Sequence, residues 1–89
     1  MQNLIRINQE DNVAVALLPI AKGETMTISQ LLVTASEDIP QGHKMAIKPI
    51  KSGESVVKYG FPIGNAKEDI QAGQWVHVHN LKTGLGDLL

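Results

Sequence analysis

Two histidines near the end of the chain have the spacing expected of a site carried by a β-strand. Residues 74–79 read Gln-Trp-Val-His-Val-His and contain the only tryptophan and two of the three histidines. Side chains alternate between the two faces of a strand, so Trp75, His77 and His79 are predicted to share one face. Imidazoles at this spacing can bind a divalent metal or orient a carboxylate. The alternative is a pair of half-exposed strand residues beside a tryptophan, because no third ligand is evident.

A second candidate site follows a glycine in the middle of the chain. His43 and Lys44 come directly after Gly42. A turn at this glycine could present the imidazole, the ammonium group and nearby backbone N–H groups to an anion. The alternative is a solvated turn in which both side chains only face water.

Lys58 and Tyr59 precede a segment that is rich in turn-forming residues. They offer a cation and a hydroxyl group, and the glycines at positions 60 and 64 would let a ligand or another chain approach the backbone closely. The alternative is a β-corner in which Tyr59 and Phe61 are packing residues. With two glycines and a proline, residues 59–65 are predicted to lack regular structure.

Several other kinds of site are excluded by the sequence. No segment matches a phosphate-binding loop, no serine lies in a nucleophile elbow, and the acidic residues form no convincing catalytic pair. The formal net charge of −1 gives no reason to expect nucleic-acid binding. No apolar run approaches the roughly 20 residues of a membrane span, and the N-terminal segment lacks the apolar region of a signal peptide. The absence of cysteine suits a cytoplasmic protein. Because the catalytic patterns named above are missing, the chain is not expected to contain a complete active site of its own.

The elements expected to position these residues are short strands in one small domain. A continuous apolar run at residues 13–18 predicts a strand that is buried on both faces. No segment sustains helical periodicity, so the chain is predicted to be mainly β, with residues 1–80 as the domain and residues 81–89 as a tail or linker. A repeated turn is also expected, in which glycine supplies a positive φ and isoleucine anchors the turn to the core. Its pattern, Ile-x-x-Gly, occurs at residues 20–23, 39–42, 50–53 and 70–73.

Several segments, taken in this order, resemble one protein family. They are Asp11-Asn12-Val13-Ala14-Val15, Gly42-His43-Lys44, Lys58-Tyr59-Gly60-x-Pro62-Ile63-Gly64, Val76-His77-Val78-His79-Asn80 and the Ile-x-x-Gly turns at 50–53 and 70–73. Together they resemble the N-terminal SAF domain, the antifreeze-like β-clip module, of altronate and galactarate dehydratases. The resemblance covers nearly the whole chain. It implies a compact all-β β-clip fold with short strands joined by glycine turns.

The resemblance also implies part of a lyase that acts on a 2,3-dihydroxy sugar acid. In that family a larger dehydratase body is present, and some members divide the two parts between a small and a large subunit. The chain is therefore expected to be either a small subunit or the first domain of a longer enzyme. The implied reaction removes a proton beside the carboxylate and releases the β-hydroxyl as water, helped by a divalent metal such as iron that is held mainly by the large subunit. The expected partners are that subunit and the sugar acid, with a homo-oligomer as a further assembly and neither nucleic acid nor a membrane.

Residue by residue, the resemblance implies two sets of contacts. The substrate contacts would be His43, Lys44, Lys58, Tyr59 and Asn80. His77 and His79 would contact a metal, with the substrate or the interface to the large subunit as alternatives. Three competing interpretations are a stand-alone module that binds sugar acids or other anions, the small subunit of a sulfolactate-type sulfo-lyase, and a structural lid whose histidines only pack.

Overall fold

The computed structural model describes residues 3–83, which form nine short strands and no helix. Accordingly, this range contains no helix that could cross a lipid bilayer. The expected all-β fold is confirmed. The strands are β1 (Leu4–Ile5), β2 (Val13–Ala16), β3 (Thr25–Ile28), β4 (Leu31–Thr34), β5 (Lys44–Ala46), β6 (Ser55–Lys58), β7 (Phe61–Ala66), β8 (Trp75–Val76) and β9 (Leu81–Thr83).

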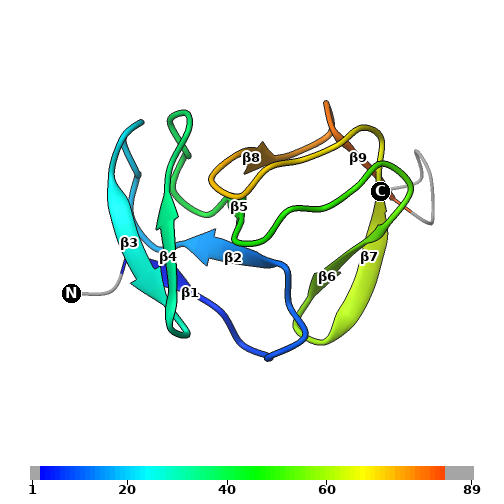
Figure 1. Ribbon diagram of the computed structural model, residues 1–89, viewed down its shortest axis with the longest axis horizontal. Coiled ribbons are helices and arrows are strands. Elements are labelled where there is room, and N and C mark those ends of the chain that lie inside the picture. The colour runs from blue at the N-terminus through cyan, green and yellow to red at the C-terminus, as the bar shows by residue number, and fades with distance from the viewer. Residues whose placement is uncertain (1–2, 84–89) are drawn as a thin grey trace.

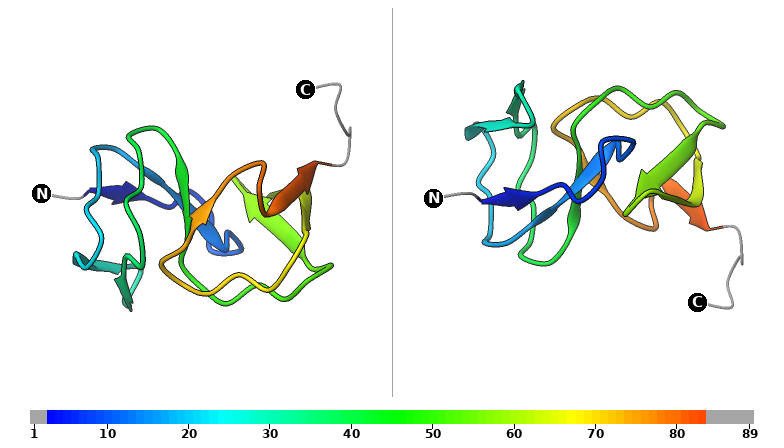
Figure 2. Two further views of the ribbon diagram at one scale, coloured as in Figure 1. Left: turned by 90° about the horizontal axis from the view of Figure 1, so that it is seen from above. Right: turned by 90° about the horizontal axis from the view of Figure 1, so that it is seen from below.

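Four strands make a central sheet in the order β1-β2-β5-β8. The hairpin β3–β4 lies at one end of the molecule, and the three-stranded sheet β6-β7-β9 lies at the other (Figures 1 and 2). All pairings between these strands are antiparallel. The body is elongated along the line that joins the two ends and measures 35 × 23 × 21 Å.

The central sheet separates two hydrophobic cores. Successive side chains of a strand point to opposite faces, and Ala14 therefore packs into the core beneath β3–β4 whereas Val13 packs into the core beneath β6-β7-β9. This confirms the prediction of a strand buried on both faces within residues 13–18. The strand ends at Ala16, and the two leucines that follow it are exposed.

The Ile-x-x-Gly turns are arranged as two facing pairs. A backbone bridge joins Ile20 to Ile39, another joins Ile50 to Ile70, and each of these side chains is 1% exposed. The predicted turn geometry is confirmed, because the four glycines all have a positive φ. The values are 93° for Gly23, 83° for Gly42, 87° for Gly53 and 95° for Gly73.

The two pairs of turns belong to two copies of one unit. Residues 19–46 and residues 49–76 each contain Pro-Ile-x-x-Gly-Glu, a hairpin, Asp-Ile-x-x-Gly and a strand. The copies share side-chain hydrogen bonds as well as sequence. In the first copy, the Ala21 N–H donates to Glu24 Oε1 at 2.9 Å and the Lys22 N–H to Asp38 Oδ1 at 2.8 Å; in the second, Lys51 donates to Glu54 at 2.7 Å and Ser52 to Asp69 at 2.9 Å. Hairpin β3–β4 therefore corresponds to hairpin β6–β7.

Of residues 59–65, for which the sequence predicts no regular structure, residues 61–65 lie in strand β7 (Phe61–Ala66). Tyr59 and Gly60 have φ values of 57° and 79°, which is the geometry of a two-residue hairpin turn between β6 and β7. A register shift between Val56 and Val57 accommodates the proline of the second strand. The prediction was wrong because glycine and proline here serve a hairpin and its irregular edge.

Strand β9 contains residues that the sequence prediction assigned to a tail. Leu81–Thr83 pair with β7, and Leu81 is only 7% exposed within the second core. A Cβ atom on Gly64 would overlap the carbonyl oxygen of Lys82, so a glycine at this position lets the two strands approach. The sheet thus continues past residue 80, and residues 84–89 of the predicted tail lie outside the described range.

Candidate functional site

Three histidine rings surround Trp75. The ring centroids of Trp75 and His77 are 5.3 Å apart and the rings are nearly parallel, at 8°. The His79 ring lies 5.4 Å from the indole. His43, from the segment before β5, lies 5.5 Å from the indole and 4.9 Å from the His77 ring, and its Nδ1 accepts a hydrogen bond from Trp75 Nε1 at 3.2 Å. The structure therefore joins His43 to the two later histidines, with Trp75 at the centre.

The histidine cluster is built on a turn. Strand β8 contains only Trp75 and Val76, and residues 77–80 turn back toward β9, so the predicted strand over residues 74–79 is too long. Asn80 is the physical reason. Its Oδ1 accepts a hydrogen bond from the His77 N–H at 2.9 Å, and its Nδ2 donates to the Trp75 carbonyl at 2.9 Å. An asparagine that bonds nearby backbone groups in this way competes with a strand ladder.

Asn80 lies beneath this turn and is 1% exposed. Both polar atoms of its side chain are engaged by backbone groups of the turn. Lys67 fixes the turn from outside, because its Nζ donates to the carbonyl of Val78 at 2.8 Å and its backbone N–H donates to that of Asn80 at 2.9 Å. The amide of Asn80 thus holds the segment that carries the histidines.

Lys44 lies beside the cluster, and Lys58 lies near Lys44. Lys44 begins β5 and is paired with Val76, next to the histidine-bearing turn, and Lys58 ends β6. Burial lowers the pKa of Lys44, and the positive charge of Lys58 lowers it further. No carboxylate among residues 3–83 contributes to this pKa. The two lysines are therefore close enough to repel each other.

His77 responds to the same charges. Burial lowers its pKa, and the charges of His43, Lys44 and His79 lower it further. The shift from the ordinary pKa of 6.5 favours the neutral form of His77. The electrostatic coupling joins the lysine of β5 and the three imidazoles into one site.

The coupling between Lys44 and His77 predicts a measurable change. In Lys44→Met a positive charge near His77 is lost, so protonation of His77 costs less and its pKa rises. Lys48→Met is the matched control, since Lys48 is exposed and does not contribute to the pKa of His77. An NMR titration of the imidazole signals measures both variants. If the His77 pKa stayed the same in Lys44→Met, the two groups would not share a site.

Tyr59 contacts Lys58. The Lys58 Nζ lies 4.7 Å from the centroid of the Tyr59 ring, which is a cation–π distance. Tyr59 is 47% exposed at the hairpin turn. Of the residues predicted for the site, His43, Lys44, His77 and His79 interact, Lys58 and Tyr59 extend the group from Lys44, and Asn80 supports it from below.

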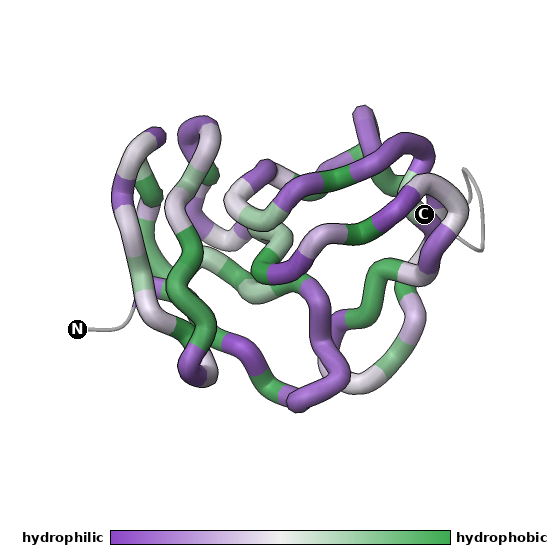
Figure 3. The backbone as a smooth tube through the Cα atoms, viewed as in Figure 1, coloured by the Kyte–Doolittle hydropathy of each residue, from purple (hydrophilic) through white to green (hydrophobic). Residues whose placement is uncertain are grey.

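The hairpin that carries Lys58 is held by Asn12, from the mainly hydrophilic loop between β1 and β2 (Figure 3). The Asn12 Nδ2 donates to the Ser55 carbonyl at 2.9 Å, and its Oδ1 accepts from the Val57 N–H at 2.8 Å. The backbone N–H of Asn12 also donates to the Val57 carbonyl at 3.2 Å. Asn12 thereby fixes β6, and with it Lys58, to the central sheet.

Asp11 holds the turn after Lys58 and makes stability sensitive to acid. Burial raises its pKa, but hydrogen bonds from the backbone of Gly60 and Asn8, and weaker ones from Tyr59 and Ile7, bring the pKa below its ordinary value of 3.8. A carboxyl group whose pKa is lower in the folded state stabilises the fold fully at a pH above its unfolded-state pKa. This stabilisation is lost as the pH falls through the folded-state pKa.

Asp11→Asn should therefore lower the free energy of unfolding by about 1–3 kcal/mol at neutral pH. Between about pH 5 and pH 2 its free energy of unfolding should fall less steeply than that of the wild type, as denaturant titrations at each pH would show. Parallel pH profiles would contradict this role.

The described residues do not form a complete metal centre. Within residues 3–83 there is no group of three or more histidine, aspartate or glutamate side chains that could hold a metal ion. His43 Nδ1 already accepts the indole N–H, and the His77 ring lies flat on the indole. Catalytic zinc, for comparison, has three protein ligands. His77 and His79 therefore do not fit a metal site made by this chain alone.

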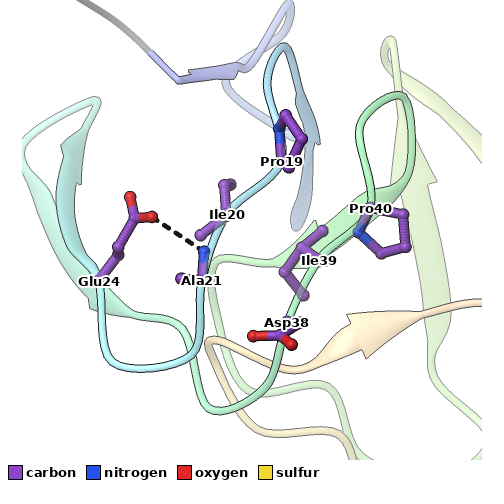
Figure 4. A pocket seen from close by; sticks show the side chains of 7 residues that line it. All are labelled: Pro19, Ile20, Ala21, Glu24, Asp38, Ile39 and Pro40. Carbon is purple, nitrogen blue, oxygen red and sulfur yellow. Dashed lines mark hydrogen bonds between the residues drawn. The ribbon is translucent and has the colours of Figure 1, made fainter.

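A pocket of about 360 Å³ lies at the first pair of Ile-x-x-Gly turns, between Pro19 and Pro40 (Figure 4). It contains none of the residues predicted for the site. Glu24 and Asp38 line it, and each carboxylate accepts a hydrogen bond from a backbone N–H of the turn at residues 20–23. These carboxylates hold the turn in place, and the chemistry-bearing side chains gather elsewhere.

Sequence reasoning left two contributors out of the site. Trp75 was placed on the histidine face but given no role, although it contacts all three imidazoles. Its being the only tryptophan was the available signal. Glu37 accepts a hydrogen bond from the Trp75 N–H at 3.1 Å across 38 residues of sequence, and no local pattern could have indicated this contact.

Comparison with known proteins agrees with this architecture. A sequence model of the altronate/galactarate dehydratase SAF domain matches residues 2–84. The chain is 47% identical over 88 residues to the altronate dehydratase of Bacillus subtilis (strain 168), which covers 99% of the chain and 18% of the relative. It is 48% identical over 84 residues to the altronate dehydratase of Escherichia coli (strain K12), which covers 94% of the chain and 17% of the relative. It is also 47% identical over 55 residues to the (2R)-sulfolactate sulfo-lyase subunit alpha of Paracoccus pantotrophus, which covers 62% of the chain and 82% of the relative.

The chain thus spans less than a fifth of the length of the two altronate dehydratases and most of the length of the sulfo-lyase subunit. The family match extends over the whole described fold, from β1 to β9. It includes both copies of the repeated unit and the lysine–histidine cluster between them. The chain belongs to the SAF domain family of altronate and galactarate dehydratases.

Proposed function

We propose that this chain supplies the anion-binding part of a sugar-acid lyase whose other catalytic groups lie on a larger polypeptide. The observation that carries the proposal is the position of Lys44 beside the three imidazoles, with the charge of Lys58 near enough to lower the pKa of Lys44 and no carboxylate contributing to that pKa. Two like charges that repel in the free chain are stabilised when an anion lies between them. The site is therefore suited to a carboxylate ligand.

The substrate class is a 2,3-dihydroxy sugar acid such as altronate or galactarate. The names of the relatives and the chemistry of the cluster support this choice. Lys44 and Lys58 would bind the substrate carboxylate. His43 accepts the indole N–H at Nδ1, so in its neutral form it carries its proton on Nε2 and can donate to a substrate hydroxyl. Neutral His77 can accept a hydrogen bond or a proton from the substrate.

The larger polypeptide would complete the reaction. Removal of the proton beside the carboxylate, with loss of the β-hydroxyl as water, needs a base and an electrophile at defined positions. Glu37, the carboxylate beside the cluster, accepts a hydrogen bond from the Trp75 N–H, and residues 3–83 contain no complete metal site. We therefore assign the divalent metal implied by the sequence resemblance to the larger polypeptide. The share of this chain is to hold the anion and orient its hydroxyl groups, with Asn80 as a positioning residue.

Reconstitution tests the proposal. The chain alone should not convert altronate or galactarate, and the chain assembled with a dehydratase body from the same family should convert one of them. Turnover by the isolated chain would contradict the division of labour, as would full turnover by the dehydratase body without the SAF domain. Sulfolactate belongs in the same assay, since release of sulfite from it would assign the chain to a sulfo-lyase.

A stand-alone anion-binding module is the second candidate. It is favoured by the fact that both lysines of the pair come from this one chain. Calorimetry of the isolated chain with a panel of aldonates and aldarates separates the two candidates. Binding without a partner would support the module, whereas heat only in the presence of the dehydratase body would support the lyase.

A further inference from the structure

The two hairpins of the repeated unit differ at their edges. In the second copy, β9 pairs with the outer edge of β7, and Asn12 covers the outer edge of β6. In the first copy, β3 and β4 form a two-stranded sheet, and no third strand from the described part of the chain joins it. Hairpin β3–β4 projects at one end of the molecule (Figures 1 and 2).

The register shows which backbone groups of β3 face outward. The N–H of Ala35 donates to the carbonyl of Glu24 at 2.8 Å, so these two residues form a hydrogen-bonded pair. Hydrogen-bonded and non-bonded pairs alternate along an antiparallel ladder, which directs the N–H and carbonyl groups of Thr25 and Thr27 away from β4. The 2.8 Å contact between the hydroxyls of Thr25 and Thr34 fits a non-bonded pair, in which side chains lie closer.

In the second copy, the backbone groups that correspond to the outward groups of Thr25 and Thr27 have hydrogen-bond partners. Ser55 and Val57 occupy the positions of Thr25 and Thr27, counted from the Gly-Glu pair that precedes each hairpin. Asn12 bonds the Ser55 carbonyl and both backbone groups of Val57. The corresponding groups of Thr25 and Thr27 have no partner within residues 3–83, and both threonines are exposed.

Apart from its short length of four residues, strand β3 lacks the features that protect a free edge. Natural edge strands are usually kept from pairing by charged residues, proline or a bulge. Strand β3 reads Thr-Met-Thr-Ile, and its pairing with β4 is regular over all four residues. On the outer face, Leu32 lies opposite Thr27 and is 75% exposed. A regular and uncharged edge of this kind can accept an added strand.

We propose that the edge of β3 binds an extended, uncharged segment of the larger lyase polypeptide, which joins hairpin β3–β4 as a third strand. This inference rests on the proposed function for the existence of that polypeptide. The hairpin is continuous with the candidate site, because Glu37, just beyond β4, bonds the Trp75 N–H and Met26 packs in the same core as Trp75. A polypeptide already bound at the site would present its strand at a high effective concentration.

A second copy of the chain fits this edge less well. Stable interfaces bury at least about 1,200 Å² in total. Two four-residue strands that pair with each other form only a few hydrogen bonds, so the edge alone would not hold a dimer together. A segment tethered to a larger contact surface needs no such area.

Amide hydrogen exchange, measured by NMR on the isolated chain and on its complex with the dehydratase body, tests the proposal. The amides of Thr25 and Thr27 should exchange rapidly in the isolated chain and at least about tenfold more slowly in the complex. Val57 is the internal control, because its N–H is already bonded to Asn12 and should be protected in both states.

A complex in which the amides of Thr25 and Thr27 stay unprotected overturns this inference and leaves the proposed function standing. Absence of any complex overturns both. Protection that grows with the concentration of the isolated chain would make a second copy the occupant and would also overturn it.

Proline substitutions give a second measurement. Thr27→Pro removes an outward N–H while keeping the hydrogen bonds inside the hairpin, because the N–H of Thr27 points away from β4. It should weaken binding to the dehydratase body by about fivefold or more, the equivalent of one hydrogen bond. Leu32→Pro makes the same change at the facing residue on the opposite edge and should change binding by less than about twofold. Equal effects of the two substitutions would overturn the assignment to β3. If Thr27→Pro does not fold by circular dichroism, the exchange measurement on the wild type decides.

Discussion

Gly73→Ala is expected to remove much of the stability of the domain. Gly73 is buried and has a φ of 95°, which costs an alanine about 1–2 kcal/mol. A Cβ atom there would also overlap the carbonyl oxygen of Thr34 and lie 3.2 Å from the backbone nitrogen of Ser36. Both neighbours are backbone atoms, so relief requires the end of β4 to move, at a further cost of about 1–3 kcal/mol. The free energy of unfolding, measured with urea, should fall by about 2–5 kcal/mol.

Gly53→Ala is the matched control for this prediction. Gly53 is the turn glycine of another Ile-x-x-Gly segment and has a φ of 87°, but a Cβ atom there would meet nothing within 4 Å. Its loss should be limited to the conformational cost of about 1–2 kcal/mol. Equal losses at the two positions would show that the approach of Gly73 to Thr34 is not a structural constraint.

Lys44→Met is expected to reduce kcat/KM of the assembled lyase by about 10- to 100-fold. The methionine keeps most of the apolar stem of the lysine but removes one of the two charges proposed to bind the substrate carboxylate. Hydrogen bonds to charged groups contribute about 1.5–3 kcal/mol, which corresponds to a loss of this size. The effect should appear mainly in KM, because the carboxylate is held in both the ground state and the transition state.

The free energy of unfolding distinguishes a role of Lys44 in substrate binding from a role in holding the fold together. Burial and the charge of Lys58 both disfavour the charged form of Lys44, so Lys44→Met should leave the free energy of unfolding unchanged or raise it. Lys48→Met, at an exposed lysine on the same chain, should alter neither activity nor stability. A Lys44→Met variant that is unstable and fully active in the surviving fraction would contradict the proposed role.

Much of the fold could be predicted because its signals are local. The four Ile-x-x-Gly segments specify turns through glycine conformation and isoleucine burial, and the structure confirms both properties. The apolar run at residues 13–18 predicted burial on two faces without showing what lay on either side. The two cores of the structure supply that answer.

The site was less predictable because its decisive contacts join distant parts of the chain. His43 meets Trp75 across 32 residues, and Asn12 holds Val57 across 45 residues. The predicted strand over residues 74–79 grouped the right histidines for an incorrect reason, since Asn80 converts most of that segment into a turn. Strand β7 was missed because hairpin-forming glycine was interpreted as a sign of irregular structure.

The division of the interior into two cores has a consequence for how the cluster could be lost. Trp75 packs against the first core, whereas Lys58 ends a strand that covers the second. The cluster exists only while both halves are folded and share the central sheet. A chain cut between the two copies of the repeated unit would lose the cluster even if each fragment kept its own apolar interior. Local opening of either half would therefore disperse the cluster before the other half unfolds, so the cluster depends on the folding of the whole domain.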